Sequence, residues 1–180
     1  SWVWIIIGTL FGGLLGAFTA KKVPMTAMPE IVALFNGCGG MSSLLVALGV
    51  ALFPSPEGSD GVVIELVRNF SIAVSLFVGA ITFSGSIVAM AKLQGWLSTP
   101  SWTQSKARHF FNILCAVLAL IGGIYLSIDG QNGLFIVLVA SSLLGIGVTL
   151  PIGGADMPVV ISLLNSYSGV AAAAAGFVVG

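Results

Sequence analysis

The chain has 180 residues, of which 57% are hydrophobic and 7% are charged, and its six basic and six acidic residues give a formal net charge of zero. A soluble domain has about a quarter of its residues charged, so most of this chain has no water to face. Six Lys and Arg residues are too few to follow a phosphate backbone, which excludes nucleic acid as a partner. Cys38 and Cys115 lie inside apolar runs without metal-ligand spacing, so we expect neither a metal site nor a disulfide.

Six apolar runs follow one another along the chain, each with about the 20 residues that a helix needs to cross a bilayer. A bilayer offers no water to unpaired backbone groups, so each run is expected to be a helix. The sequence therefore predicts an all-α polytopic bundle, a single transmembrane domain over residues 1–180. Its spans are expected at about 2–20, 31–53, 70–91, 110–128, 133–151 and 158–180.

Turn-forming and polar residues separate these runs, among them the connections at 54–58 and 129–132. Residues 62–69 precede a span that is already long enough. They are therefore expected to form a short interfacial helix, with Glu65 and Arg68 outside the hydrocarbon.

Six spans place their connections alternately on the two sides of the membrane. One side would hold only Arg68, and the other would hold Lys21, Lys22, Lys92, Lys106 and Arg108. The positive-inside rule makes the second side cytoplasmic, or matrix-facing in an organelle.

The ends of the sequence indicate a fragment. Ser1 is not an initiator residue, and the chain stops at Gly180 within an apolar run. We expect a piece of a longer subunit.

The sequence repeats itself at an offset of 129 residues. Met28–Pro29 recurs as Met157–Pro158, and Asn36 recurs as Asn165. Four spans separate the two copies, so both would point the same way across the membrane, as in the parallel repeats of transport folds.

Each asparagine follows the proline of its repeat by seven residues, which carries both amides roughly 10 Å into the membrane. An amide in hydrocarbon is costly without partners, so each must face protein or water. They could form hydrogen bonds between helices or line a polar path, and the residues alone leave both open. Thr82 and Ser86 lie one turn apart on the third span, although such hydroxyls often bond their own backbone.

Acids and small residues complete the pattern. Glu30 and Asp156 lie near helix N-termini, where the partial positive charge favours an acid. Small residues let membrane helices approach closely. We expect helix packing at Gly8, Gly12, Gly16, Gly40 and Gly169.

Catalytic apparatus is missing from the sequence. No Asp, Glu, Lys, Arg or His lies in the middle of a predicted span, where a self-contained proton pump usually has one. The run Gly37–Gly40 follows no strand and lies inside a span, so it is not a dinucleotide loop. We expect no hydride-transfer site, no metal and no cofactor in this chain.

Three runs carry a resemblance to a known family: KKVPMTAMPEIVAL at Lys21–Leu34, FVGAITFSGSIVAMAKLQG at Phe77–Gly95 and PIGGADMPVVISLLNSYSGVAAAAAGF at Pro151–Phe177. They resemble the membrane domain of the β subunit of proton-translocating NAD(P)+ transhydrogenase, and the similarity extends over nearly the whole chain. That family couples hydride transfer between NAD(H) and NADP(H), bound on separate soluble domains, to proton movement.

The resemblance implies roles for particular residues. The family's proton pathway falls on Asn36, Ser86 and Asn165, and its cytoplasmic coupling face on Asp156 and Glu30. Many members have histidine where this chain has Asn36, and an amide cannot titrate near neutral pH. Either a partner helix supplies the titrating group or water alone bridges the gap.

The resemblance also implies partners and a place in the cell. We expect α-subunit membrane helices, an NAD(H) domain, an NADP(H) domain reached by one further crossing, and the lipid bilayer. The complex is expected to be a homodimer in a bacterial inner membrane, or a mitochondrial one. Two alternatives are a secondary transporter for a small solute and a structural anchor for a multisubunit enzyme.

Overall fold

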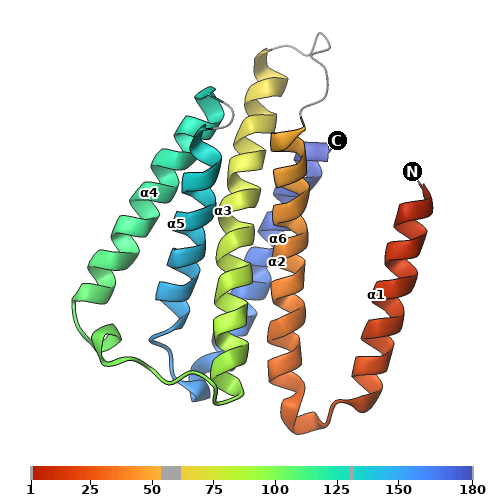
Figure 1. Ribbon diagram of the computed structural model, residues 1–180, viewed down its shortest axis with the longest axis vertical. Helices are drawn as coiled ribbons and strands as arrows, with labels where there is room; N and C mark the ends of the chain where they lie inside the picture. The colour runs from red at the N-terminus through yellow and green to blue at the C-terminus, as the bar shows by residue number, and fades with distance from the viewer. Residues whose placement is uncertain (1, 54–61, 130–131, 180) are drawn as a thin grey trace.

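The computed structural model describes residues 2–53, 62–129 and 132–179, which form six α-helices and three 3-10 helices without a strand. The α-helices run alternately up and down, and both chain ends lie at the same end of the molecule (Figure 1). This confirms the prediction of an all-α bundle. The helices are α1 (Trp2–Lys22), α2 (Met28–Leu52), α3 (Val62–Leu93), α4 (Ala107–Asp129), α5 (Asn132–Thr149) and α6 (Met157–Val179).

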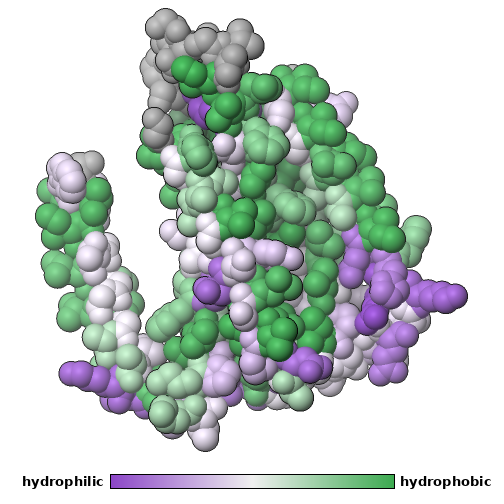
Figure 2. Space-filling model, turned by 180° about the vertical axis from the view of Figure 1, so that it is seen from behind, coloured by the Kyte–Doolittle hydropathy of each residue, from purple (hydrophilic) through white to green (hydrophobic). Residues whose placement is uncertain are grey.

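Five of these helices are long and apolar enough to cross a membrane, namely all except α5. The 18 residues of α5 extend about 27 Å, close to the roughly 30 Å of a hydrocarbon core. Figure 2 shows a largely hydrophobic surface, with the strongly hydrophilic residues gathered mostly in the lower half of that view. The chain is therefore an integral membrane protein. The predicted connection at 54–58, and residues 130–131 of the one at 129–132, lie outside the described residues.

Helix α3 lies at the centre and packs against α2, α4, α5 and α6. Its buried residues Leu76 and Ala80 join Leu44 of α2 and Val137 of α5 in one apolar cluster. The single hydrogen of the Ser75 hydroxyl is shared between the backbone oxygens of Ser43, at 3.1 Å, and Ala171, at 3.3 Å, so that Ser75 links three helices.

The separate interfacial helix expected over residues 62–69 is wrong. These residues form the first turns of α3, which continues unbroken to Leu93. No glycine or proline lies between Val62 and Val78, so nothing in this sequence interrupts the helix. At about 48 Å, a 32-residue helix exceeds the hydrocarbon thickness and projects beyond it.

The predicted repeat is confirmed in the local structure. The 3-10 turns η1 (Met25–Ala27) and η3 (Gly154–Asp156) precede α2 and α6, which begin at Met28 and Met157. The residues before the turns, Pro24 and Gly153, have nearly equal backbone angles: φ −68° and ψ 152° in one, φ −69° and ψ 157° in the other. The same residue pattern therefore builds the same turn twice.

The first helix of each copy packs differently. Helix α5 contacts α3 and α4, whereas α1 stands apart from the other helices (Figure 1) and buries none of its described residues. A Cβ added at Gly8, Gly12 or Gly16 would meet nothing within 4 Å. The expected packing of these three glycines is therefore not made within the described part of this chain.

Candidate functional site

A buried polar pair joins α2 to α3. The Nδ2 atom of Asn36 donates a hydrogen bond to the Oγ atom of Ser86 over 2.9 Å. Asn36 is 8% exposed and Ser86 is fully buried. Two of the three residues expected on a proton pathway are thus in direct contact, 50 positions apart in sequence.

Two glycines of α2 permit this contact. A Cβ added at Gly37 would lie 3.2 Å from the Cβ of Ser86, and one added at Gly40 would lie 2.9 Å from the Cβ of Thr82. Larger residues would hold the helices apart, so these glycines set the distance at which the Asn36 amide reaches its acceptor. The expected packing role of Gly40 is consistent with this close approach, whereas the role of Gly37 was not predicted.

The amide of Asn36 is only half satisfied. Its Oδ1 atom is buried and has no hydrogen-bond partner within the described residues. A buried acceptor without a donor costs on the order of 1–3 kcal/mol. This oxygen is therefore a ready site for a water molecule or for a proton donor from outside the chain.

The second hydroxyl of the predicted stripe has a different partner. Thr82 is fully buried one turn before Ser86, but its Oγ1 donates to the backbone oxygen of Val78, at 2.7 Å, in its own helix. Of Thr82 and Ser86, only Ser86 accepts a hydrogen bond from Asn36.

Asn165 does not join the pair. The asparagines occupy equivalent places, eight residues after the first residue of α2 or α6. However, Asn165 is exposed, whereas its neighbour Leu164 is buried. In α2 the equivalent neighbour, Phe35, is 47% exposed. The two copies therefore turn different faces toward the bundle, which the repeat alone could not predict.

The exposed face of α6 is polar for a membrane helix. Asn165 shares it with the exposed residues Ser162, Ser166 and Gly169. A Cβ added at Gly169 would meet nothing within 4 Å, so its expected packing is not made within the described chain. An amide in hydrocarbon needs a partner, and this surface is therefore the face that another polar element would cover.

The two predicted acids lie beside the turns of the repeat. The Glu30 carboxylate accepts a hydrogen bond from the Gln94 side chain, just beyond α3, and Asp156 is exposed in η3. Both turns lie at the same end of the molecule, the lower end in Figure 1.

The same end holds a lysine with three partners, which the sequence did not single out. Lys92 Nζ donates to the backbone oxygens of Leu150, at 2.5 Å, and Ile152, at 2.6 Å. It also donates to Thr99 Oγ1 at 2.8 Å. Lys92 entered the prediction only as one of the positive charges on that side.

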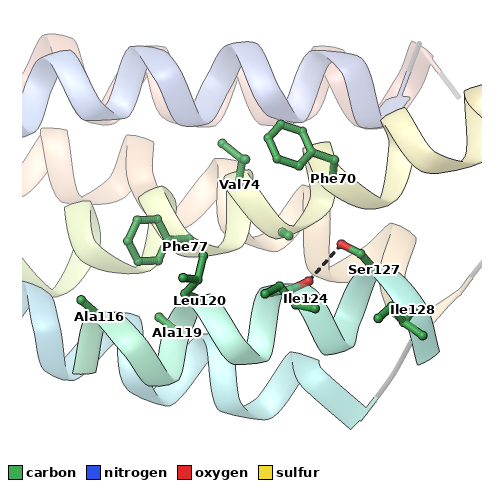
Figure 3. Close-up of a pocket in the computed structure, with 11 residues that line it drawn as sticks. Phe70, Val74, Phe77, Ala116, Ala119, Leu120, Ile124, Ser127 and Ile128 are labelled. Atoms are coloured by element: carbon green, nitrogen blue, oxygen red, sulfur yellow. Dashed lines mark hydrogen bonds between the residues drawn. The ribbon is translucent and has the colours of Figure 1, made fainter. Parts of the chain in front are cut away.

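An apolar groove of about 460 Å³ lies between α3 and α4, lined by large side chains that include Phe70 and Leu120. Figure 3 shows them with Ser127, the one hydroxyl in the lining. That hydroxyl donates to the Gly123 backbone oxygen, at 2.9 Å, in its own helix. The groove offers no free polar group, so it does not extend a polar path.

The described residues contain no group of three or more His, Cys, Asp or Glu side chains that could hold a metal ion. The run Gly37–Gly40 lies within α2, so no strand precedes it and it cannot form a dinucleotide loop. The unpaired Oδ1 beside the Asn36–Ser86 hydrogen bond could accept a hydrogen bond from a water molecule.

Comparison with known proteins decides the family. The family model of the NAD(P) transhydrogenase beta subunit matches residues 1–180. The chain belongs to this family. The NAD(P) transhydrogenase subunit beta of Rhodospirillum rubrum is 39% identical over 181 residues. A second sequence, from a named strain of that species, gives the same identity. The chain matches over its full length and spans 39% of the length of these transhydrogenase subunits.

Proposed function

We propose that this chain is the proton-conducting membrane part of a transhydrogenase that couples hydride transfer between NAD(H) and NADP(H) to proton translocation. Both nucleotides bind on separate soluble domains in this proposal, and the hydride is transferred there. The observation that supports it most is the buried Asn36–Ser86 pair, because it leaves the Asn36 Oδ1, in an apolar helix, without a donor among the described residues. A polar path requires such an acceptor, whereas a lipid-facing anchor does not.

The titrating group of the path comes from outside this chain. Asparagine and serine do not titrate near neutral pH, and among the described residues no Asp, Glu, Lys, Arg or His lies in the middle of a span. A membrane helix of the α subunit, carrying a histidine or a carboxylate, would supply the group. The unpaired Oδ1 of Asn36 and the exposed amide of Asn165 are the two places on the proposed path where such a helix would find partners, although Asn112 Oδ1 and Ser141 Oγ are also unpaired within the described residues.

Within this proposal the chain's own residues have distinct roles. Asn36 and Ser86 fix the orientation of a water chain, and Asn165 continues it along the surface between α6 and the partner helix. The turns that carry Glu30 and Asp156 face the NADP(H) domain. Shifts of these turns would open the water chain alternately to the two sides of the membrane.

The positions of the Lys and Arg residues indicate which end of the bundle faces the cytoplasm. Lys21, Lys22, Lys92 and Arg108 lie at the end of the bundle that holds both repeat turns. By the positive-inside rule this end is cytoplasmic in a bacterial inner membrane, or matrix-facing in a mitochondrion. The resemblance further implies that the full complex is a homodimer.

Changing Ser86 to alanine tests the pair. The substitution removes the acceptor of the Asn36 Nδ2 and leaves a second buried polar atom unpaired. Coupled proton uptake by vesicles containing the intact enzyme is expected to fall about tenfold, because an unpaired buried group costs about 1–3 kcal/mol. A pH-sensitive dye inside the vesicles measures the uptake.

Thr82→Val is the matched control, since the Thr82 hydroxyl bonds only its own helix. Its proton uptake is expected to stay at the wild-type level. Normal uptake in the Ser86→Ala enzyme, or an equal loss in both variants, would contradict the role of the pair.

A further inference from the structure

The ammonium group of Lys92 uses all of its hydrogen-bonding capacity on other segments. A lysine has three N–H donors and no acceptor, and the three acceptors here are Leu150, Ile152 and Thr99. None of them belongs to α3. This many directed bonds is unusual for a lysine that serves only as a topological charge at the membrane surface.

Two of these acceptors are backbone oxygens near the C-terminus of a helix, where a positive charge is stabilising. Helix α5 ends at Thr149, so the Leu150 and Ile152 oxygens lie just past its C-terminus. The Leu150 carbonyl, directly after the helix, is one of those that lack a helical partner at the negative end of the helix dipole, and the Ile152 carbonyl belongs to the segment that follows. Lys92 therefore caps α5 from a different helix and holds the segment that leads into η3.

Its neighbour Gln94 makes the corresponding contact with the other copy of the repeat. The Gln94 side chain donates to the carboxylate of Glu30, in the first turn of α2. An apolar cluster that includes Ala33, Ala89 and Met157 joins α2, α3 and α6 at this end. The end of α3 thus holds both repeat turns, one through Gln94 and one through Lys92.

The same helix carries the buried hydroxyl. Ser86 precedes Lys92 by six residues, about 9 Å along α3. A continuous helix transmits an axial or rotational shift over so short a distance without loss. A displacement of the turn that carries Asp156 would therefore reach the Ser86–Asn36 hydrogen bond through Lys92 and α3.

We propose that Lys92 is a positioning residue that links the Asp156 turn to the Asn36–Ser86 pair. Its hydrogen bonds to the Leu150 and Ile152 oxygens keep residues 150–152 fixed to the end of α3, and its third bond holds Thr99. The predicted effect on proton movement rests on the proposed function. The role of Lys92 in holding residues 150–152 does not depend on it.

Two measurements on the intact enzyme test the proposal, with Lys92→Met and Lys92→Arg variants. Methionine keeps the length of the side chain without its donors, and arginine keeps both charge and donors. Hydrogen exchange of the backbone amides over residues 150–156 reports how firmly the turn is held. In the Lys92→Met enzyme this exchange is expected to quicken about tenfold, and coupled proton uptake to fall about tenfold.

The Lys92→Arg enzyme is expected to remain near the wild type in both measurements. The matched control is Lys106→Met, which removes an exposed lysine at the same end of the bundle and is expected to change neither. Unchanged exchange over residues 150–156 in the Lys92→Met enzyme would overturn the proposal. Faster exchange with undiminished proton uptake would overturn the link to the pair.

These outcomes are distinct from failure of the proposed function. If leucine at Asn165 left proton uptake intact, the proton path would fail whatever Lys92 did. If that variant stopped uptake while Lys92→Met changed nothing, the path would stand and only the link would be wrong.

Discussion

Leucine at Asn36 is expected to stop coupled proton uptake by the intact enzyme, while hydride exchange between the soluble domains continues. The substitution removes the donor of the bond to Ser86 and the unpaired Oδ1 together, and it places two methyl groups in a buried polar site. Removing a polar group that must bind water or a proton inside a membrane is expected to raise the barrier to proton transfer by about 2.7 kcal/mol. The rate of proton uptake would then fall on the order of 100-fold. Vesicles with an internal pH dye measure the uptake.

Asn112→Leu provides the control for Asn36→Leu. Asn112 also has a buried Oδ1 without a partner among the described residues, but its Nδ2 donates to the Gly147 backbone oxygen, at 3.4 Å, between α4 and α5 and not to Ser86. Its loss is expected to lower the thermal unfolding midpoint without stopping proton uptake by the folded enzyme. Equal losses of uptake in the two variants would show that any buried amide matters equally, and the assignment of Asn36 would be wrong.

Leucine at Asn165 is expected to reduce coupled proton uptake to a similar extent, through a different physical route. Asn165 is exposed, so the substitution removes no packing contact that the described chain makes. Thermal stability of the chain should therefore be unchanged or slightly higher. A loss of uptake can then come only from the polar surface that α6 shares with its partner, and the proton-to-hydride ratio measures it.

Ser127→Leu is the control for a half-buried hydroxyl that lies away from α6. It also replaces a polar residue by leucine in a membrane helix, but its hydroxyl is satisfied within α4 and faces an apolar groove (Figure 3). Uptake in this variant is expected to equal that of the wild type. Should Asn165→Leu behave like Ser127→Leu, Asn165 would be a lipid-facing residue and not part of the path.

Local features of this fold could be predicted because they depend on short stretches of sequence. The length of the apolar runs determines the helices, and the Met-Pro repeat determines turns that match at Met28 and Met157. Asn36 and Ser86 were named together only by the family resemblance, and their contact was not predicted, because it depends on the close approach that Gly37 and Gly40 permit.

Other features depend on which face each helix buries, and no period in the sequence specifies this when lipid and protein are equally apolar. Asn165 has the same place in its repeat as Asn36, yet Leu164 is buried where Phe35 is not. Helix α1 has a glycine ridge but packs against nothing described in this chain. The bonds of Lys92 to backbone oxygens were unpredictable for another reason, since every residue has such an oxygen.

The two alternatives differ from the proton path in what they need from the asparagines. A secondary transporter for a small solute would need an anchor for its substrate, and the described spans contain no charged group at mid-depth. A structural anchor would need only small residues and apolar surface, and both amides would then be dispensable.

The most direct test is therefore coupled proton uptake by vesicles containing the intact enzyme with leucine at both Asn36 and Asn165. The proton path predicts an assembled enzyme whose soluble domains still exchange hydride but whose vesicles take up no protons. Wild-type proton uptake in the double variant would contradict it and would favour the structural anchor.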